Sequence, residues 1–148
     1  MIEAPGGRKA QIVLVEDNPA DVDLLRRALR SAALDCELRV IEDGAEALAF
    51  VSQEKEKETG APIPDLVVLD MNLPKNSGQE ILEAMRTNRV FAKVPVAILT
   101  SSSSPRERTK MEGLDVGRYI LKPPDLEEYL RIGLILKELL VESGFRGH

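Results

Sequence analysis

The chain has little of the chemistry on which many enzymes and secreted proteins depend, because its 148 residues include one cysteine, one histidine and no tryptophan. Cys36 has no second cysteine to pair with, which excludes an internal disulfide. The single histidine, His148, is the last residue and leaves no set of side chains for a histidine-based metal site or a Ser-His-Asp triad. The N-terminal residues lack the apolar core of a signal peptide, so we expect a cytoplasmic protein.

Basic charge and long apolar runs are also scarce. The 20 lysine and arginine residues are outnumbered by 25 acidic residues, which gives a net charge of −5, whereas nucleic-acid-binding proteins usually carry a basic face. The longest apolar stretch, LRIGLILKELL, contains Arg131 and Lys137 and is shorter than the roughly 20 residues that span a bilayer. The sequence therefore predicts neither a nucleic-acid partner nor a membrane segment.

Apolar residues make up 43% of the sequence, which is enough for one globular core. Short apolar runs typical of buried strands alternate with helical patterns. The predicted strands are 12–16, 37–41, 66–70, 95–99 and 118–121, and the predicted helices are 19–33, 44–51, 79–87, 106–114 and a last one that begins near Asp125. This alternation predicts an α/β fold, a doubly wound five-stranded parallel sheet with five helices. We expect one domain at 11–142, with an N-terminal tail at 1–10 and a C-terminal tail at 143–148.

The segment SQEKEKETGAPIP, residues 52–64, interrupts this alternation after the second predicted helix. Its first half is charged and its second half is rich in glycine and proline. It is either an extended, solvent-exposed link or, in its charged half, a continuation of the preceding helix supported by pairs of opposite charge three residues apart.

Acidic residues end two of the predicted strands. Glu16 and Asp17 follow the first strand, and Asp70 ends the third, where a charge after an apolar run is costly unless it is compensated. Ligands of open parallel sheets bind at the carboxyl ends of the strands, and the flavodoxin-like order 2-1-3-4-5 brings these three carboxylates together there. Such a cluster favours Mg²⁺, because like charges repel unless a cation lies among them. Alternatively, each acid separately caps a helix or turn, as Asp17 and Asn18 before Pro19 suggest.

The other two strand ends carry complementary groups. The fourth predicted strand runs into the hydroxyls of Thr100 and Ser101, and the fifth runs into Lys122, which Pro123 follows. A lysine and a hydroxyl beside a carboxylate supply the charge neutralisation and the hydrogen bond that a phosphoryl group on that carboxylate needs. Taken singly, the lysine is equally well explained as a solvated residue and Thr100 as a helix cap.

Together, the motifs VEDN, LDMNLPKNSG, ILTS and YILKPP resemble those of the receiver domain, the phosphoacceptor module of bacterial two-component response regulators, over about residues 11–141. The resemblance implies that Asp70 accepts a phosphoryl group from a sensor histidine kinase or a phosphotransfer protein. It also implies Mg²⁺ ligation by Asp17, Asp70 and the backbone carbonyl of Asn72, with Glu16 acting through metal-bound water. We therefore expect not an enzyme but a signalling protein that assists its own phosphorylation and dephosphorylation.

The resemblance further implies how the phosphoryl group is held and sensed. Lys122 pairs with the phosphoryl oxygens, and the Thr100 hydroxyl, beside Ser101, moves to bond them. Tyr119 turns inward when the threonine moves. The peptide bond between Lys122 and Pro123 is expected to be cis, which places the lysine.

Some positions depart from the family pattern or tune it. Asn76 stands near the place of a frequent acid, before the structural Gly78, whose backbone freedom we expect the turn to need. The stretch GLDVGRYI replaces the more usual Gly-Ala-x-x-Tyr pattern before the fifth strand. The side chains of Asn72 and Ser102 occupy positions that tune hydrolysis in the family, so the motifs leave the phosphoryl lifetime open.

No output domain fits after Val141, so we expect signalling by contact with a downstream protein. The last predicted helix carries leucine and isoleucine over more than one core-facing stripe, which indicates either ordinary exposed leucines or a surface for a homodimer or another partner. The 52–64 segment and the wording LDMNLPKNSG are similar to stand-alone regulators that accompany phytochrome-type kinases. That segment either serves kinase recognition or is a tolerated insertion.

Three other functions compete with this interpretation. A phosphatase of the haloacid dehalogenase type needs a second carboxylate two residues after its aspartate, where this chain has Asn72. A flavodoxin-like flavin or nucleotide carrier needs Gly, Ser or Thr around a phosphate after the first strand, where EDNPAD stands. The third alternative is an adaptor of receiver fold that binds its partners without being phosphorylated.

Overall fold

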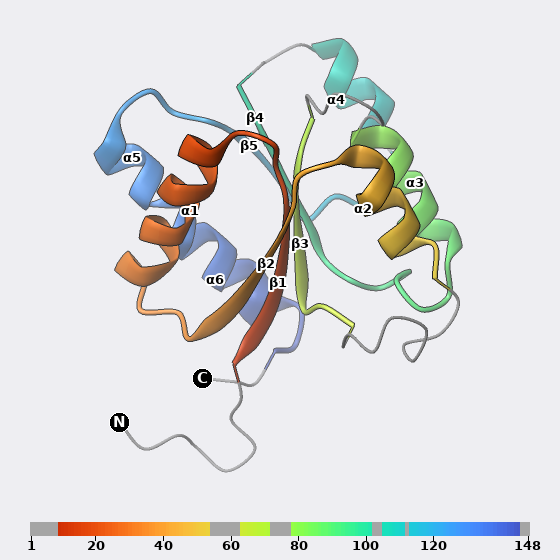
Figure 1. Cartoon of the computed structure of the whole chain (residues 1–148), viewed down its shortest axis with the longest axis horizontal. Helices are drawn as coiled ribbons and strands as arrows, with labels where there is room; N and C mark the ends of the chain where they lie inside the picture. Colours follow the sequence, from red (N-terminus) through yellow and green to blue (C-terminus); the bar gives the residue numbers. More distant parts are fainter. Residues whose placement is uncertain (1–8, 54–62, 72–77, 102–104, 112, 146–148) are drawn as a thin grey trace.

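The computed structural model describes residues 9–53, 63–71, 78–101, 105–111 and 113–145. They form a five-stranded parallel sheet in the order β2-β1-β3-β4-β5 (Figure 1). Its strands are β1 (Ala10–Val15), β2 (Cys36–Ile41), β3 (Leu66–Asp70), β4 (Val96–Thr100) and β5 (Arg118–Leu121). The predicted fold class and strand order are confirmed, and β1 begins two residues earlier than predicted.

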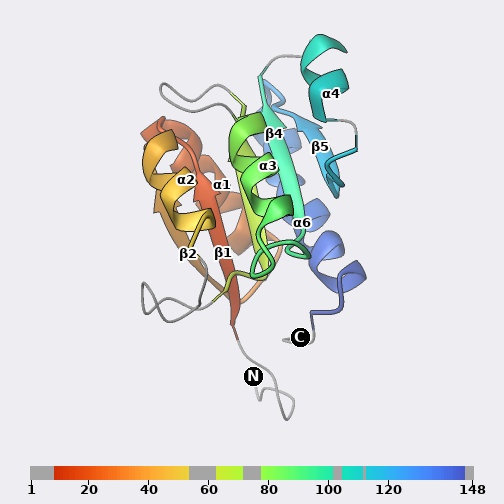
Figure 2. The same ribbon diagram turned by 90° about the vertical axis from the view of Figure 1, so that its right-hand side faces the viewer.

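Helices cover both faces of the sheet (Figures 1 and 2). One face carries α1 (Pro19–Ser31), α5 (Leu126–Leu130) and α6 (Ile132–Glu142), and the other carries α2 (Gly44–Val51) and α3 (Gly78–Thr87), with α4 (Pro105–Met111) at the carboxyl end of the sheet. The predicted last helix is thus present as two segments, α5 and α6. They meet at Arg131, whose own backbone is helical.

The central strands are buried on both faces, and the alternation of their side chains divides the core into two layers. Val67 and Leu69 of β3 pack with residues of α2 and α3. Leu66 and Val68 of the same strand pack with residues of α1 and α6. All five residues of β3 are buried, which explains why its sequence reads as a continuous apolar run that ends in one carboxylate.

Helix α1 begins where the sequence predicts, at the Asn18-Pro19 step. The Oδ1 atom of Asn18 accepts a hydrogen bond from the Ala20 amide at 2.9 Å, and Pro19 occupies the first helical position, where no amide donor is needed. The N-cap is therefore Asn18, which leaves the capping alternative for Asp17 unsupported.

Helices α1 and α6 approach each other unusually closely. A Cβ atom at Gly133 would clash with the carbonyl of Ala28, so only glycine fits at this crossing. The Nζ atom of Lys137 donates to the carbonyl oxygen of Ala32, the C-cap of α1, at 3.1 Å. Helix α1 is thus backed directly by α6.

Arg86, near the end of α3, holds two loops at once. Its guanidinium donates to the carbonyl oxygens of Leu114 at 2.8 Å, Ala92 at 3.0 Å, Val94 at 2.8 Å and Asp115 at 2.9 Å. The residues before β5, where the sequence departs from the family pattern, are therefore held by hydrogen bonds from the Arg86 side chain.

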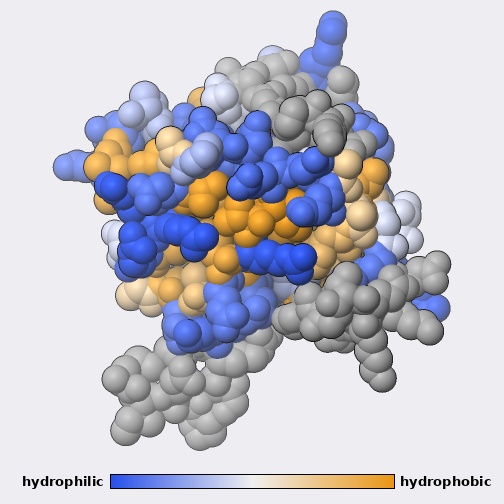
Figure 3. Space-filling view, viewed as in Figure 1, coloured by the Kyte–Doolittle hydropathy of each residue, from blue (hydrophilic) through white to orange (hydrophobic). Residues whose placement is uncertain are grey.

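The strand β2 forms one edge of the sheet. Its half-buried Leu38 and Val40 alternate with the exposed Glu37 and Arg39. Figure 3 shows apolar residues gathered at the centre of this face, over β2 and between α1 and α2, with hydrophilic residues around them. Among the helices of the described part of the chain, none is both long and apolar enough to cross a membrane.

Candidate functional site

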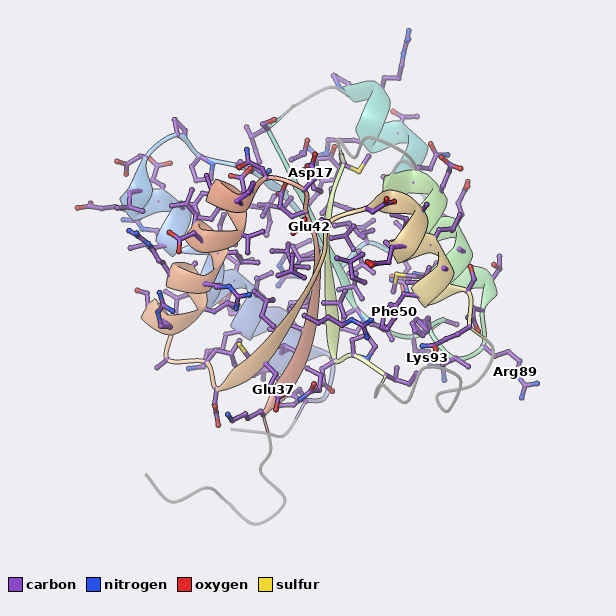
Figure 4. The ribbon with its side chains drawn as sticks, in the orientation of Figure 1. Asp17, Glu37, Glu42, Phe50, Arg89 and Lys93 are labelled. Atoms are coloured by element: carbon purple, nitrogen blue, oxygen red, sulfur yellow. The ribbon has the colours of Figure 1, made fainter. Side chains whose placement is uncertain are left out.

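The carboxyl end of the sheet brings the three predicted acids together. The register pairs Val15 of β1 with Leu69 of β3, so the next residues along the chain, Glu16 and Asp70, lie next to each other at the carboxyl end of the sheet. One carboxylate oxygen from each of Glu16, Asp17 and Asp70 lies within 4.8 Å of the others. Asp17 is exposed and lies at this end of the sheet in Figure 4, with Glu37 at the opposite end.

Glu16 and Asp70 are almost fully buried, with 1% and 5% of their surfaces exposed. Burial, a hydrogen bond to Asp70 and the charge of Asp70 raise the pKa of Glu16 to about 7, although Lys122 acts in the opposite direction. The Glu16 carboxylate also accepts a hydrogen bond from the Asn18 amide at 3.2 Å. A cluster of hard oxygen ligands with one exposed member fits Mg²⁺, which keeps several waters and takes few protein ligands.

Lys122 reaches into this cluster from the end of β5. Its Nζ atom lies 2.9 Å from Oε1 of Glu16, 2.9 Å from Oδ2 of Asp21 and 3.8 Å from Oδ2 of Asp70. Burial alone lowers the pKa of Lys122, but the hydrogen bonds to Asp21 and Glu16 outweigh burial and raise it above its ordinary value. The predicted proximity of lysine and acids is therefore present in the structure.

Asp21 is a site residue that the sequence interpretation missed. It occupies the third position of α1, and its side chain is 22% exposed. In the sequence it looks like an ordinary acid in the first turn of a helix, where negative charge is favourable. Its only sequence signal is its place four residues after Asp17, which puts it one helical turn into α1 and near the strand ends.

Thr100 and Ser101 lie beside the acids at the end of β4. Thr100 is fully buried, whereas Ser101 is exposed. The Thr100 carbonyl accepts a hydrogen bond from the Lys122 amide at 2.6 Å, which ties the ends of β4 and β5 together. The predicted hydroxyl and lysine thus belong to neighbouring strand ends.

Tyr119 is half-buried on β5, on the side of the sheet that faces α2 and α3. The guanidinium carbon of Arg108 in α4 lies 4.8 Å from the centre of its ring, a cation–π contact. Both residues line an open cavity of about 490 Å³ that also includes Met111 and Val116. Tyr119 therefore connects β5, the strand that Lys122 follows, to the helix α4.

The expected cis peptide bond before Pro123 is wrong for this structure. The described part of the chain contains no cis peptide bond, so Lys122 and Pro123 are joined in trans. The trans form is the more stable isomer of such bonds. Lys122 reaches the carboxylates from it, so the lysine is placed by its ion pairs instead.

Gly78 has a structural role, but for a different reason from the one expected. It is the first residue of α3, and the positive φ values of the described glycines belong to Gly113 and Gly144. A Cβ atom at Gly78 would lie 3.0 Å from the sulfur of Met71 and 3.3 Å from the carbonyl oxygen of Asp70. Space beside the end of β3, rather than backbone freedom, therefore favours glycine.

Two of the predicted residues, Asn72 and Ser102, and most of the 52–64 segment lie outside the described residues. The metal ligand expected from the Asn72 carbonyl and the tuning roles of both side chains stay predictions.

Tyr129 of α5 is a second neighbour of the site that the sequence did not reveal. It is 2% exposed, and its hydroxyl has no hydrogen-bond partner among the described residues. Burial and then the charge of Asp21 raise its pKa, which Lys122 partly offsets. Tyr129 therefore lies close enough to Asp21 and Lys122 for the charges of both to act on its hydroxyl.

A parallel sheet of this order, with acids, a hydroxyl and a lysine at its carboxyl end, is the construction of a phosphoacceptor domain. The sequence matches the response regulator receiver domain family over residues 12–132. The chain belongs to this family, the phosphoacceptor module of two-component signalling, which confirms the resemblance of the four motifs.

Within this family, the chain is similar to response regulators from cyanobacteria, in sequence and in structure. The response regulator Rcp1 of Synechocystis is 36% identical over 121 residues, which cover 82% of each chain. The structure of RcpA, a phosphorylated cyanobacterial phytochrome response regulator, superposes with a TM-score of 0.81 at 32% identity and covers 93% of this chain and 98% of that one. The Mn²⁺-bound form of Rcp1 gives a TM-score of 0.78 at 32% identity and covers 92% and 97%.

Proposed function

We propose that this chain is a response regulator that accepts a phosphoryl group on Asp70 from a sensor histidine kinase, with the help of Mg²⁺. The observation that carries the proposal is the position of Asp70, a buried carboxylate with Glu16 and Asp17 within 4.8 Å and the Lys122 ammonium at 3.8 Å. The clustered carboxylates attract Mg²⁺. The bound Mg²⁺ can in turn hold the oxygens of a phosphoryl group next to Asp70. The proposed boundaries of the receiver domain are residues 11–142.

Mg²⁺ is assigned to Asp17 and Asp70, to the carbonyl of Asn72 and, through water, to Glu16. When bound, it supplies positive charge that neutralises and orients the oxygens of the incoming phosphoryl group. The chain's own groups do the rest. Asp70 attacks the phosphorus while the bond from phosphorus to the kinase's histidine nitrogen breaks, Lys122 stabilises the charge on the transferring oxygens, and the Thr100 hydroxyl donates a hydrogen bond to them. The same groups position water for the later dephosphorylation that we assign to the protein itself.

The test is intact-protein mass after incubation with Mg²⁺ and acetyl phosphate, on wild type and on Asp70→Asn. We expect one phosphoryl adduct on wild type and none on the variant. Asp65→Asn, which makes the same change at the opposite end of β3, is the control and should be labelled like wild type.

An adduct that persists in Asp70→Asn would overturn the assignment of the acceptor. If neither acetyl phosphate nor a purified cognate kinase labels wild type, the phosphorylation-independent adaptor becomes the better function.

The partners that we propose are a kinase of the phytochrome type, a downstream protein and a second copy of this chain. The description of RcpA as a cyanobacterial phytochrome response regulator supports the first. The second and third rest on large apolar side chains that are about half exposed on β5, α5 and α6, namely Leu121, Leu126, Leu134 and Val141. A monomeric mass in sedimentation that does not change with concentration would remove the homodimer. The cytoplasmic location stays a prediction.

A further inference from the structure

Lys122 is held by one carboxylate that belongs to the predicted phosphoacceptor set and by one that does not. The Nζ atom donates to Oε1 of Glu16 and to Oδ2 of Asp21, each at 2.9 Å. Its distance to Oδ2 of Asp70 is 3.8 Å, which is too long for a hydrogen bond. In this arrangement the ammonium is committed to Asp21 and Glu16 rather than to Asp70.

Asp21 is well suited to hold a cation in this place. It lies in the first turn of α1, where the helix dipole favours a negative charge, and 22% of its side chain is exposed against 11% for Lys122. The buried Tyr129 of α5 lies near this pair. A partly buried ion pair is screened less by salt than one on the surface, so the attraction between Asp21 and Lys122 is stronger than that of an exposed pair.

A phosphoryl group on Asp70 needs the same ammonium. Lysine offers three N–H donors from one nitrogen, of which two already point to Asp21 and Glu16. A phosphoryl group on Asp70 adds oxygens that accept hydrogen bonds from a nearby ammonium, so these oxygens compete with Asp21 for Lys122. Asp21 also adds a negative charge beside the path of an anionic phosphodonor.

We propose that Asp21 is a positioning residue that holds Lys122 in the unphosphorylated protein and yields it to the phosphoryl group, and that this competition slows phosphorylation of Asp70. The proposal rests on the proposed function. In the transfer, an Asp70 oxygen forms a bond to phosphorus while the bond to the donor's leaving group breaks. With acetyl phosphate, acetate leaves with the bonding electron pair, and Lys122 changes partner without losing its proton.

The test compares wild type with Asp21→Asn, Asp21→Glu and Asp23→Asn. Asp23 lies two residues further along α1 and pairs with Arg27 at 3.0 Å, so Asp23→Asn removes the same charge from the same helix without touching Lys122. Two quantities are measured with saturating Mg²⁺. They are the second-order rate constant of phosphorylation by acetyl phosphate and the affinity for beryllofluoride, which binds Asp70 as a phosphoryl mimic without a covalent step.

For Asp21→Asn we expect both the rate constant and the beryllofluoride affinity to rise, on the order of three- to ten-fold, because Lys122 is released in advance. Asp23→Asn and Asp21→Glu should stay within about two-fold of wild type, since the first leaves the pair intact and the second keeps a carboxylate near Lys122. A thermal melt checks that each variant is folded. A merely structural role for Asp21 would lower stability without raising either quantity.

Equal or lower values in Asp21→Asn than in Asp23→Asn would overturn the inference while leaving the proposed function intact. The same holds if Asp21→Glu behaves like Asp21→Asn, because the carboxylate would then not be what holds Lys122. If wild type takes neither acetyl phosphate nor beryllofluoride, the proposed function fails, and this inference falls with it.

Discussion

The strands β3 and β5 both end beside the site, but they hold their terminal residues by different means. Asp70 ends a strand whose five residues are all buried between two layers of helices. Lys122 follows a strand of four residues that are half-buried or exposed, with Leu121 51% exposed. The acceptor is therefore fixed by packing and the lysine by ion pairs. Packing permits one position, whereas ion pairs can be exchanged, so the lysine is the partner that is built to change contacts.

The largest effect should come from disturbing the packing of β3. Leu69→Ala removes a fully buried side chain directly before Asp70, and we expect a loss of about 3 kcal/mol in the free energy of unfolding. Leu121→Ala, the matched change directly before Lys122, should cost less than about 1 kcal/mol. Urea denaturation measures both. Similar losses in the two variants would show that β5 is as firmly packed as β3.

The second prediction removes the ion pairs that hold the lysine. Lys122→Met should lower the rate of phosphorylation by acetyl phosphate about 100-fold, because the charge on the transferring oxygens loses its cation. Lys93→Met is the control, since Lys93 is exposed and lies far from Asp17 in Figure 4. Phosphorylation of Lys122→Met at the rate of the control would contradict the role of this ammonium.

The third prediction concerns the loops before β4 and β5, which the Arg86 side chain joins. Arg86→Met leaves four carbonyl oxygens without their donor, and we expect a loss of about 2 kcal/mol in the free energy of unfolding. Arg89→Met, at an exposed position on the same side of the molecule, should change stability by less than about 0.5 kcal/mol. If the two variants unfold at the same urea concentration, the contacts of Arg86 contribute nothing to stability.

A further expected effect is a dependence of stability on pH. The pKa of Glu16 is about 7 in the folded protein and ordinarily 4.5, so the folded state binds the proton more tightly than the unfolded state. Its contribution is complete below pH 4.5 and is lost as the pH rises through about 7. In the presence of a chelator, urea denaturation between pH 5 and 8 should show this fall in wild type but not in Glu16→Gln. Saturating Mg²⁺ should reduce it, because the charge of the nearby metal favours the deprotonated form of Glu16.

The fold was predictable because local patterns and sheet topology agree. Five apolar runs of strand length between helical patterns allow few arrangements, and the carboxyl ends of the strands then bring Glu16, Asp17 and Asp70 together without knowledge of any contact. The predicted ends of the elements were less accurate, since hydrogen bonding adds Ala10 to β1 and a tight turn at Arg131 divides the last helix.

The contacts of Lys122 could not be predicted in the same way. Asp21 and Lys122 are 101 positions apart, and nothing in the PAD stretch distinguishes an acid that holds a lysine from one that faces the solvent. Tyr129 was hidden for a related reason, because its burial depends on how α5 lies against α1. The trans bond before Pro123 shows the limit of the resemblance, since the isomer depends on the surroundings as well as on the residue pair.

The close crossing at Gly133 has a mechanical consequence. At this crossing the backbone of one helix lies against that of the other, with no side chain between them to absorb a displacement, so we expect a movement of α6 to be passed on to α1. The outer surface of α6 carries the exposed Leu134 and Val141, and the first turn of α1 carries Asp21. We therefore expect a protein that binds α6 to displace Asp21 relative to Lys122, and, by linkage, the release of Lys122 to change the affinity of α6 for that protein.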